Sequence, residues 1–197
     1  MNLEALETRI AACTLCADRF AVTETAHAPR PVVYPSTTAR VMIAGQAPGA
    51  RVHASGIPFD DPSGDRLRDW LGINRETFYD RSRIAIVPMA FCFPGYDAKG
   101  SDLPPPKICA KTWRADLMAA MPQVELTLMI GQYAQAWHMK TERKKNLTET
   151  VRAWRDYSPT VLPLPHPSWR NTGWLKKNVW FADEILPWLR AEISRLV

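Results

Sequence analysis

Four short apolar segments, each followed at once by glycine or proline, constrain the fold of this 197-residue chain most strongly. They are residues 40–44, 84–87, 126–130 and 160–162. Their nearly continuous hydrophobicity is typical of strands buried on both faces, as in parallel sheets that helices cover. Apolar residues at helical spacing occupy segments 2–12, 63–71, 110–121 and 174–196. The sequence therefore predicts an α/β fold of three layers, in which a central, mostly parallel four-stranded sheet lies between helices.

The chain also carries signals for where helices begin and end. Ser63 is expected to cap helix 63–71, and Asp65 lies in its first turn, where a carboxylate interacts favourably with the helix dipole. Pro187 is expected to interrupt the last helical region. The length suits one ordinary domain, and no linker-like stretch divides the chain, so residues 1–197 are expected to form a single domain.

The four cysteines form two groups. Cys13 and Cys16 are separated by two residues, whereas Cys92 and Cys109 lie in the middle of the chain. Thiolates are the soft ligands that zinc and iron–sulfur centres select, and a Cys-x-x-Cys pair lets both sulfurs reach one site. The alternative is four unrelated buried thiols, because free cysteine behaves as a small hydrophobic residue. The pattern favours a metal or cluster site.

The sequence also bears on where the protein acts. No apolar run approaches the roughly 20 residues that span a bilayer, and the first residues are polar and acidic, unlike a secretion signal. The sequence therefore predicts a cytoplasmic protein with no membrane segment. Disulfides are rare in a reducing compartment, which again favours metal binding by the cysteines.

Basic residues outnumber acidic ones, which gives a formal charge of +5, and the excess lies mainly in the second half of the chain. The basic positions there include Lys140, Arg143, Lys144, Lys145, Arg152, Arg155, Arg170, Lys176 and Lys177. Such clusters neutralise the phosphates of nucleic acids in some proteins and only keep a surface solvated in others. Charge alone leaves both interpretations open.

Chemically distinctive segments follow the predicted strands. They are loop 45–49, the segment of Cys92 and the segment of His166. Ligands of open α/β sheets bind beyond the carboxyl ends of the strands, so we expect these segments to gather at one edge of the sheet.

Two of these segments suit a pocket for a flat base. Glycines on both sides of Pro48 fix a tight turn whose backbone amides can point into a pocket, and Phe59 offers an apolar plate for stacking. His166 lies between two prolines, which hold its backbone extended and suit a ring that presents a nitrogen to a substrate oxygen. A structural turn and a structural histidine are the alternatives.

Together, Gly-x-Ala-Pro-Gly at 45–49, Gly-x-Pro-Phe at 56–59 and His-Pro-Ser at 166–168 resemble the motifs of the uracil-DNA glycosylase superfamily. The cysteines resemble those of its iron–sulfur branch, represented by families four and five, and the resemblance runs from about residue 10 to residue 170. It implies a 4Fe–4S cluster, with zinc as the alternative. The implied ligands are Cys13, Cys16, Cys92 and Cys109.

The resemblance further implies base excision, in which a nucleotide is extruded from DNA and the base–sugar bond is hydrolysed. His166 and the backbone amide of Gln46 would stabilise negative charge on the departing uracil, and Phe59 would stack on the base beside Ala47. The implied DNA contacts, with Trp169 or Arg170 as a wedge, are Ser168, Trp169, Arg170, Asn171 and Lys176. The partner is single- or double-stranded DNA, and the chain is expected to act as a monomer.

This chain departs from the family pattern in the pocket. Gln46 stands where Glu is usual, and Ala47 replaces the carboxylate that activates water in other branches of the superfamily. Asp60 and Asp61 follow closely and become the candidate catalytic carboxylates. His53 is a further candidate for contact with the base.

The favoured function is therefore a DNA glycosylase that excises uracil or a related deaminated base. The asparagine expected to recognise the uracil edge is absent from segment 88–91, which leaves base selectivity open. One alternative is a DNA-binding relative with weak or no cleavage activity. Another is a small-molecule nucleoside N-glycosidase, although a free nucleoside needs no basic, tryptophan-rich segment after His166.

Overall fold

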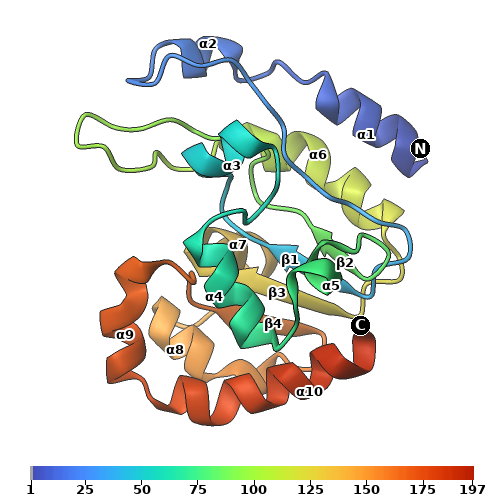
Figure 1. Cartoon of the computed structure of the whole chain (residues 1–197), viewed down its shortest axis with the longest axis vertical. Coiled ribbons are helices and arrows are strands. Elements are labelled where there is room, and N and C mark those ends of the chain that lie inside the picture. The colour runs from blue at the N-terminus through green and yellow to red at the C-terminus, as the bar shows by residue number, and fades with distance from the viewer. Residues whose placement is uncertain (1) are drawn as a thin grey trace.

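The computed structural model describes residues 2–197, which fold around a central parallel sheet (Figure 1). The strands are β1 (Val41–Ala44), β2 (Ile84–Ile86), β3 (Leu126–Ile130) and β4 (Val161–Leu164). Their order in the sheet is β2-β1-β3-β4, and each neighbouring pair is parallel. The predicted α/β fold with a four-stranded central sheet is confirmed.

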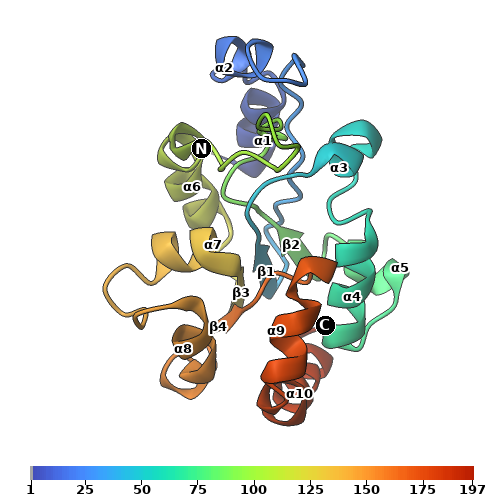
Figure 2. The ribbon, with the colours of Figure 1, turned by 90° about the vertical axis from the view of Figure 1, so that its left-hand side faces the viewer.

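Helices surround the sheet (Figures 1 and 2). The α-helices are α1 (Leu3–Ala11), α2 (Ala17–Ala21), α3 (Ala50–Ser55), α4 (Pro62–Leu71), α5 (Arg75–Tyr79), α6 (Lys107–Ala120), α7 (Gly131–His138), α8 (Leu147–Arg152), α9 (Thr172–Lys177) and α10 (Leu186–Leu196). Short 3-10 turns are η1 (Trp154–Asp156) and η2 (Trp169–Asn171), and a π turn, η3 (Phe181–Ile185), leads into α10. Within residues 2–197, none of the helices has the length and hydrophobicity needed to cross a bilayer.

The strands bury side chains on both faces of the sheet, which explains their continuous hydrophobicity. Val41 and Ile43 belong to a core that includes Trp70 of α4 and Leu189 of α10. The intervening Met42 belongs to a second core, formed with Leu6 and Ile10 of α1 and Trp113 and Leu117 of α6. The sheet is therefore the middle layer of the molecule.

The start of α4 differs from the prediction. Asp61, not Ser63, is the N-cap residue, and its carboxylate accepts a hydrogen bond of 2.9 Å from the backbone N–H of Gly64. Pro62 then occupies the first turn, where its missing N–H is not needed. Asp65 lies in the first turn as predicted, and it pairs with Arg68 at 2.5 Å.

The C-terminal region is also divided differently. The predicted interruption near Pro187 is wrong, because Pro187 lies in the first turn of α10, where a helix tolerates proline. The break falls earlier, where α9 ends and Asn178 forms its C-cap. The short helices α3, α5, α7 and α8 were not predicted from the sequence.

Candidate active site and cysteine site

The carboxyl edge of the sheet collects the predicted pocket segments. Loop 45–49 follows β1 and leads into α3, Gly131 begins α7 directly after β3, and His166 follows β4. A Cβ atom added at Gly131 would lie 3.9 Å from the Cβ of His166, so these two segments approach each other. Figure 2 shows this side of the molecule, with α3, α4, α7 and α9 around the strands.

Phe59 is held firmly over the glycine loop. A Cβ atom added at Gly45 would lie 3.4 Å from the ring of Phe59, and the ring of Phe78 packs edge-on at a centroid distance of 6.2 Å. Phe59 adopts a left-handed φ of 55°, which is costly for a bulky residue. The carbonyl oxygen of Phe59 comes so close to Gly64 that an added Cβ would lie 1.8 Å away. Glycine at 64 therefore makes this placement of Phe59 possible.

His166 is fixed in one tautomer by its neighbours. Its Nδ1 accepts a hydrogen bond of 3.1 Å from the backbone N–H of Ser168, and its carbonyl oxygen accepts one of 2.7 Å from Asn171 Nδ2. Because a backbone N–H only donates, Nδ1 carries no proton and the neutral ring carries its proton on Nε2. Burial lowers the pKa of His166, and the nearby carboxylate of Asp61 opposes that shift. The ring is therefore neutral at pH 7, with an N–H donor at Nε2.

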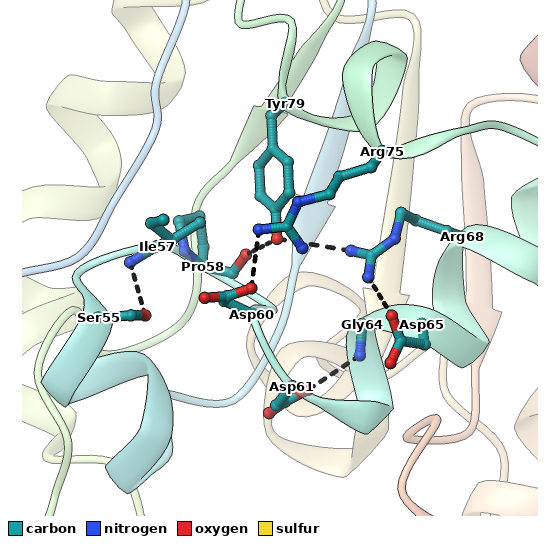
Figure 3. Close-up of polar contacts among 10 residues, drawn as sticks. All are labelled: Ser55, Ile57, Pro58, Asp60, Asp61, Gly64, Asp65, Arg68, Arg75 and Tyr79. Carbon is teal, nitrogen blue, oxygen red and sulfur yellow. Dashed lines mark hydrogen bonds and ion pairs between the residues drawn. The ribbon is translucent and has the colours of Figure 1, made fainter.

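The two candidate carboxylates have different partners (Figure 3). Asp60 forms an ion pair of 2.8 Å with Arg75, whose guanidinium lies 4.9 Å from the centroid of the Tyr79 ring. Asp61 caps α4 and raises the pKa of His166, so it is the carboxylate that acts on the histidine. Asp60 is neutralised by an arginine, whereas Asp61 has no cationic partner among residues 2–197 and is bonded to the backbone N–H of Gly64.

A third carboxylate, Asp102, joins this group, although no sequence motif pointed to it. It lies in the hairpin between Cys92 and α6, where Asp102 forms an isolated antiparallel bridge with Tyr96. Burial raises the pKa of Asp102, Arg170 lowers it and Asp61 raises it. The hairpin therefore brings a carboxylate towards Asp61 and the segment after His166, although Asp102 itself is exposed.

His53 lies between the pocket loop and the cysteine region. Its ring packs edge-on against His27 at a centroid distance of 5.0 Å and tilts against Phe93 at 5.9 Å. Its Nδ1 is buried and has no hydrogen-bond partner, and burial lowers the pKa of the ring. The structure thus places His53 against residues that flank the cysteine segments. Gln46 and Ala47 lie half-buried in the loop itself.

The segment after His166 presents an exposed aromatic side chain. Trp169 is 72% exposed, and the guanidinium of Arg170 lies 5.9 Å from its ring centroid. Arg66 of α4 holds this segment in place, because it donates to the carbonyl oxygen of Ser168 at 3.0 Å and to the hydroxyl of Thr172 at 3.3 Å. Lys176 is exposed on α9. The role of Arg66 was not foreseen from the sequence.

The four cysteines come together in one pocket. Cys13 follows α1, Cys16 is the N-cap residue of α2, Cys92 follows β2, and Cys109 lies in the first turn of α6. All four are free thiols, and all line a pocket that also includes Trp113. Burial raises the pKa of the Cys92 and Cys109 thiols to about 12 in each case. Residues far apart in the sequence thus converge as predicted.

The surroundings of the cysteines fit a metal–thiolate centre. Three buried side-chain nitrogens in residues 2–197 lack a hydrogen-bond partner, and two of them, Trp113 Nε1 and Arg114 Nη2, lie on α6 near Cys109. Buried N–H donors need acceptors, and the sulfurs of a metal–thiolate centre are suitable ones. Yet no three His, Cys, Asp or Glu side chains among residues 2–197 already stand in a metal-binding arrangement. Four iron atoms bind their cysteines at separate corners of a cluster, which suits sulfurs that are spread apart.

The chain is similar to a solved structure and matches a family model. The solution NMR structure of a "putative Uracil DNA glycosylase" from Methanosarcina acetivorans is similar, with 15% identity, 83% of this chain and 94% of that chain covered, and a TM-score of 0.48. A family model described as the uracil DNA glycosylase superfamily matches residues 31–190. This range contains the pocket motifs, Cys92 and Cys109, but not Cys13 or Cys16. Since the match covers most of the chain, this protein belongs to the uracil DNA glycosylase superfamily.

Proposed function

We propose that this protein is a DNA glycosylase that removes uracil, or a related deaminated base, by hydrolysing the bond between base and sugar. One observation carries the proposal: His166 is a neutral ring with its N–H at Nε2, at the carboxyl edge of the sheet where loop 45–49 and Phe59 also lie. Membership of the superfamily supports the same reaction class.

The proposed reaction depends on stabilising the departing base. Negative charge develops on the uracil oxygen as the bond to the sugar breaks, and fixed N–H donors stabilise such charge without reorganising. His166 Nε2 provides one donor, held by the Ser168 backbone, and the backbone N–H of Gln46 provides a second. A neutral histidine suits this role, because it donates a hydrogen bond while its other nitrogen stays occupied.

Phe59 provides the stacking surface for the flipped base. Its position is set by Gly45 below the ring, Phe78 at its edge and Gly64 beneath its carbonyl. Because these contacts are made within the protein, the ring needs no rearrangement when the base enters.

Asp61 is the carboxylate that we assign to the sugar side of the reaction. It acts electrostatically on His166, whereas Asp60 is paired with Arg75. A carboxylate near the bond being broken stabilises positive charge on the sugar or orients the attacking water. Asp61 therefore replaces the carboxylate that Ala47 lacks.

We further propose that the protein belongs to the iron–sulfur branch and that Cys13, Cys16, Cys92 and Cys109 hold a 4Fe–4S cluster, with zinc as the alternative. The soft thiols, their shared pocket and the unpaired donors on α6 support this. When bound, such a centre supplies a structural cross-link. It would tie the N-terminal helices α1 and α2 to the sheet and to α6.

DNA binding is assigned to the surface after β4. Trp169 is the exposed wedge, Arg170 lies against it, and Arg66 anchors the segment to α4. Asn171 also braces the His166 carbonyl, and Lys176 provides a phosphate contact nearby on α9. One segment thus joins the wedge to the catalytic histidine.

The proposal is tested by measuring free base released from oligonucleotides that carry uracil, hypoxanthine or xanthine, in single and double strands, with mass spectrometry. Wild type is expected to release at least one of these bases, and His166→Ala is expected to abolish most of that release. His27→Gln is the matched control for loss of a half-buried histidine, because its ring nitrogens bond to Thr25 and to the Phe93 carbonyl and its ring contacts His53. An equal loss of release in both variants would show that the histidines support the fold and that His166 is not the donor. Salt-sensitive DNA binding without any base release would favour the DNA-binding alternative, which the absence of the usual Glu at position 46 and of the asparagine in segment 88–91 supports.

A further inference from the structure

Arg114 of α6 is a buried cation without an anionic partner. It is 2% exposed and donates from Nε to His138 Nε2 at 2.8 Å and from Nη1 to the carbonyl oxygens of Val87 and Pro88 at 3.0 and 3.1 Å. All three acceptors are neutral groups. Its Nη2 is buried with no partner, and no ion pair is found for it among residues 2–197.

A second buried arginine shows what is unusual about Arg114. Arg68 is 7% exposed, but it pairs with Asp65 at 2.5 Å and lies over the rings of Phe78 and Tyr79. A buried charge without a counter-ion destabilises the folded protein about as strongly as the breaking of a buried ion pair does. Arg68 therefore has the partner that Arg114 lacks.

The charge on Arg114 persists despite this cost. Burial lowers the pKa of Arg114 to about 10, so the guanidinium is still protonated at pH 7. His138 cannot supply a negative charge, because burial and Arg114 lower its pKa to about 3 and keep it neutral. The anion that matches Arg114 must come from another neighbour.

That neighbour is the cysteine site. Arg114 follows Cys109 on α6, directly after Trp113, which lines the cysteine pocket, and Arg114 and Cys109 are close enough to interact electrostatically. Arg114 also holds the carbonyls of Val87 and Pro88, which precede Cys92 in the chain. One side chain therefore connects the strand end that leads to Cys92 with the helix that carries Cys109.

The negative charge of a metal–thiolate centre would make a buried cation favourable at this place. Four thiolates around a 4Fe–4S core, or around one zinc ion, leave a net charge of about −2. Cys92 and Cys109 are half-buried in a pocket lined otherwise by apolar side chains, where an anionic centre is costly. A buried positive charge beside them offsets part of the cost of forming an anionic centre.

We propose that Arg114 is the buried countercharge of the cysteine metal centre and that the indole N–H of Trp113, its neighbour on α6, donates a hydrogen bond to a sulfur there. This inference rests on the proposed metal centre, not on the proposed glycosylase reaction. Trp113 lines the cysteine pocket, is 6% exposed, and its Nε1 has no protein partner. Hydrogen bonds to sulfur and nearby charge are the means by which proteins tune such centres.

The test uses Arg114→Met, with Arg68→Met as the matched control. Purified protein is divided into a metal-loaded sample and a chelator-stripped sample, and urea unfolding and the rate of metal loss to the chelator are measured for each. Arg114→Met is expected to lose metal about tenfold faster than wild type, since outer partners of metal ligands are worth about 10- to 100-fold in affinity. The stripped Arg114→Met protein is expected to lose less stability than the loaded one, because the lost hydrogen bonds to His138, Val87 and Pro88 affect both samples, whereas the lost countercharge affects only the loaded sample. Arg68→Met is expected to destabilise both samples equally and to retain metal normally.

Two conservative variants keep the test decisive if Arg114→Met folds poorly. Arg114→Lys preserves the charge and is expected to lose metal within about threefold of the wild-type rate, whereas Trp113→Phe removes only the N–H and is expected to lose it about threefold faster. If the centre contains iron, its reduction potential is expected to fall in Arg114→Met, because the positive charge that stabilises the added electron has been removed.

Two different results would contradict this inference. Equal destabilisation of stripped and loaded Arg114→Met, with metal loss at the wild-type rate, would make Arg114 a purely structural residue. Wild-type protein that binds neither iron nor zinc would remove the metal centre and this inference with it. Base release by wild type is measured separately, so either result leaves the proposed glycosylase reaction standing.

Discussion

The pocket and the cysteine site are both built from segments distant in sequence, but they differ in how far the protein satisfies its own polar groups. In the pocket, His166 Nδ1 accepts from Ser168, Asp60 pairs with Arg75, and Asp61 caps α4. In the cysteine site, Trp113 Nε1 and Arg114 Nη2 have no partner. The third unpartnered buried nitrogen of residues 2–197, Nδ1 of His53, belongs to a ring that packs against His27 and Phe93, on the side of the cysteine segments.

The two sites therefore differ in how far they are organised before a ligand binds. Polar groups that are already bonded within the protein keep their geometry before substrate arrives, which is what transition-state stabilisation requires. Buried donors without partners, beside four cysteines, fit the proposal that a bound metal centre completes this site. Changes in the pocket should therefore alter activity more than stability, and changes in the cysteine site should alter stability through metal binding.

Loss of the histidine donor should have the largest effect. His166→Ala is expected to lower the rate of base release by about 10²- to 10³-fold, the usual cost of removing one donor to a developing anion. Its urea midpoint should stay close to that of wild type. A rate within about threefold of wild type, measured by single-turnover assay, would show that His166 is not the donor.

Loss of a thiol ligand should have the next largest effect. Cys109→Ser is expected to purify with little bound iron or zinc and to lose roughly 2–3 kcal/mol of unfolding free energy, the stabilisation that a ligand gives at about 100 times its Kd. Elemental analysis and urea unfolding measure both quantities. Unchanged metal content would exclude Cys109 as a ligand.

Displacing Phe59 from a distance should have an intermediate effect. Gly64→Ala places a Cβ 1.8 Å from the carbonyl oxygen of Phe59, so the backbone must shift. We expect kcat/KM to fall about tenfold and the free energy of unfolding to fall by about 1–3 kcal/mol, which is the usual effect of overpacking. Gly173→Ala is the matched control, since an added Cβ there meets nothing within 4 Å and should change stability by no more than about 0.5 kcal/mol.

The pH dependence of base release should show a smaller effect. Because burial lowers the pKa of His166 below 6.5, the neutral donor persists as pH falls through 6.5, and activity is expected to stay level there. The same lowered pKa means that the unfolded chain binds a proton before the folded one does. The stability that depends on neutral His166 is thus full above pH 6.5 and is lost as pH falls towards the lowered pKa. An activity drop centred at or above pH 6.5 would contradict a buried, neutral ring.

Phosphate contacts should have the smallest effect. Arg170→Ala and Lys176→Ala are each expected to reduce the slope of log affinity against log salt by about 1, with little dependence on DNA sequence. Fluorescence anisotropy over a salt series measures the slope. An unchanged slope in both variants would move the DNA-binding surface elsewhere.

The strands could be predicted from the sequence because they depend on local patterns, whereas the grouping of the cysteines was implied by the family resemblance. Continuous apolar runs place β1 to β4 within one or two residues of their observed bounds. Pro163 does not end β4, which continues to Leu164, because β4 is an edge strand and such strands tolerate proline. Helix α3 has only six residues, too few for an apolar repeat to be recognised. The cap of α4 was misplaced because Asp61 and Ser63 are both good cap residues, and only the position of Pro62 distinguishes them.

The missing parts of the two sites depend on contacts between distant residues. Arg66 reaches Ser168 across the fold, and Asp102 approaches Asp61 through a hairpin. Arg114, with Asp116 close behind it in the chain, looks like any surface arginine in the sequence until its burial is known. Contacts between residues so far apart produce no regular spacing that could be recognised in the sequence.

Hydrogen exchange, followed by mass spectrometry on metal-loaded and chelator-stripped protein, tests most directly the claim that the pocket is complete without a ligand and the cysteine site is not. Stripping is expected to reduce protection in segments 10–22 and 90–113, which carry the cysteines, and to leave segments 45–71 and 162–172 unchanged. Equal loss of protection in all four segments, or no change in any, would contradict the account.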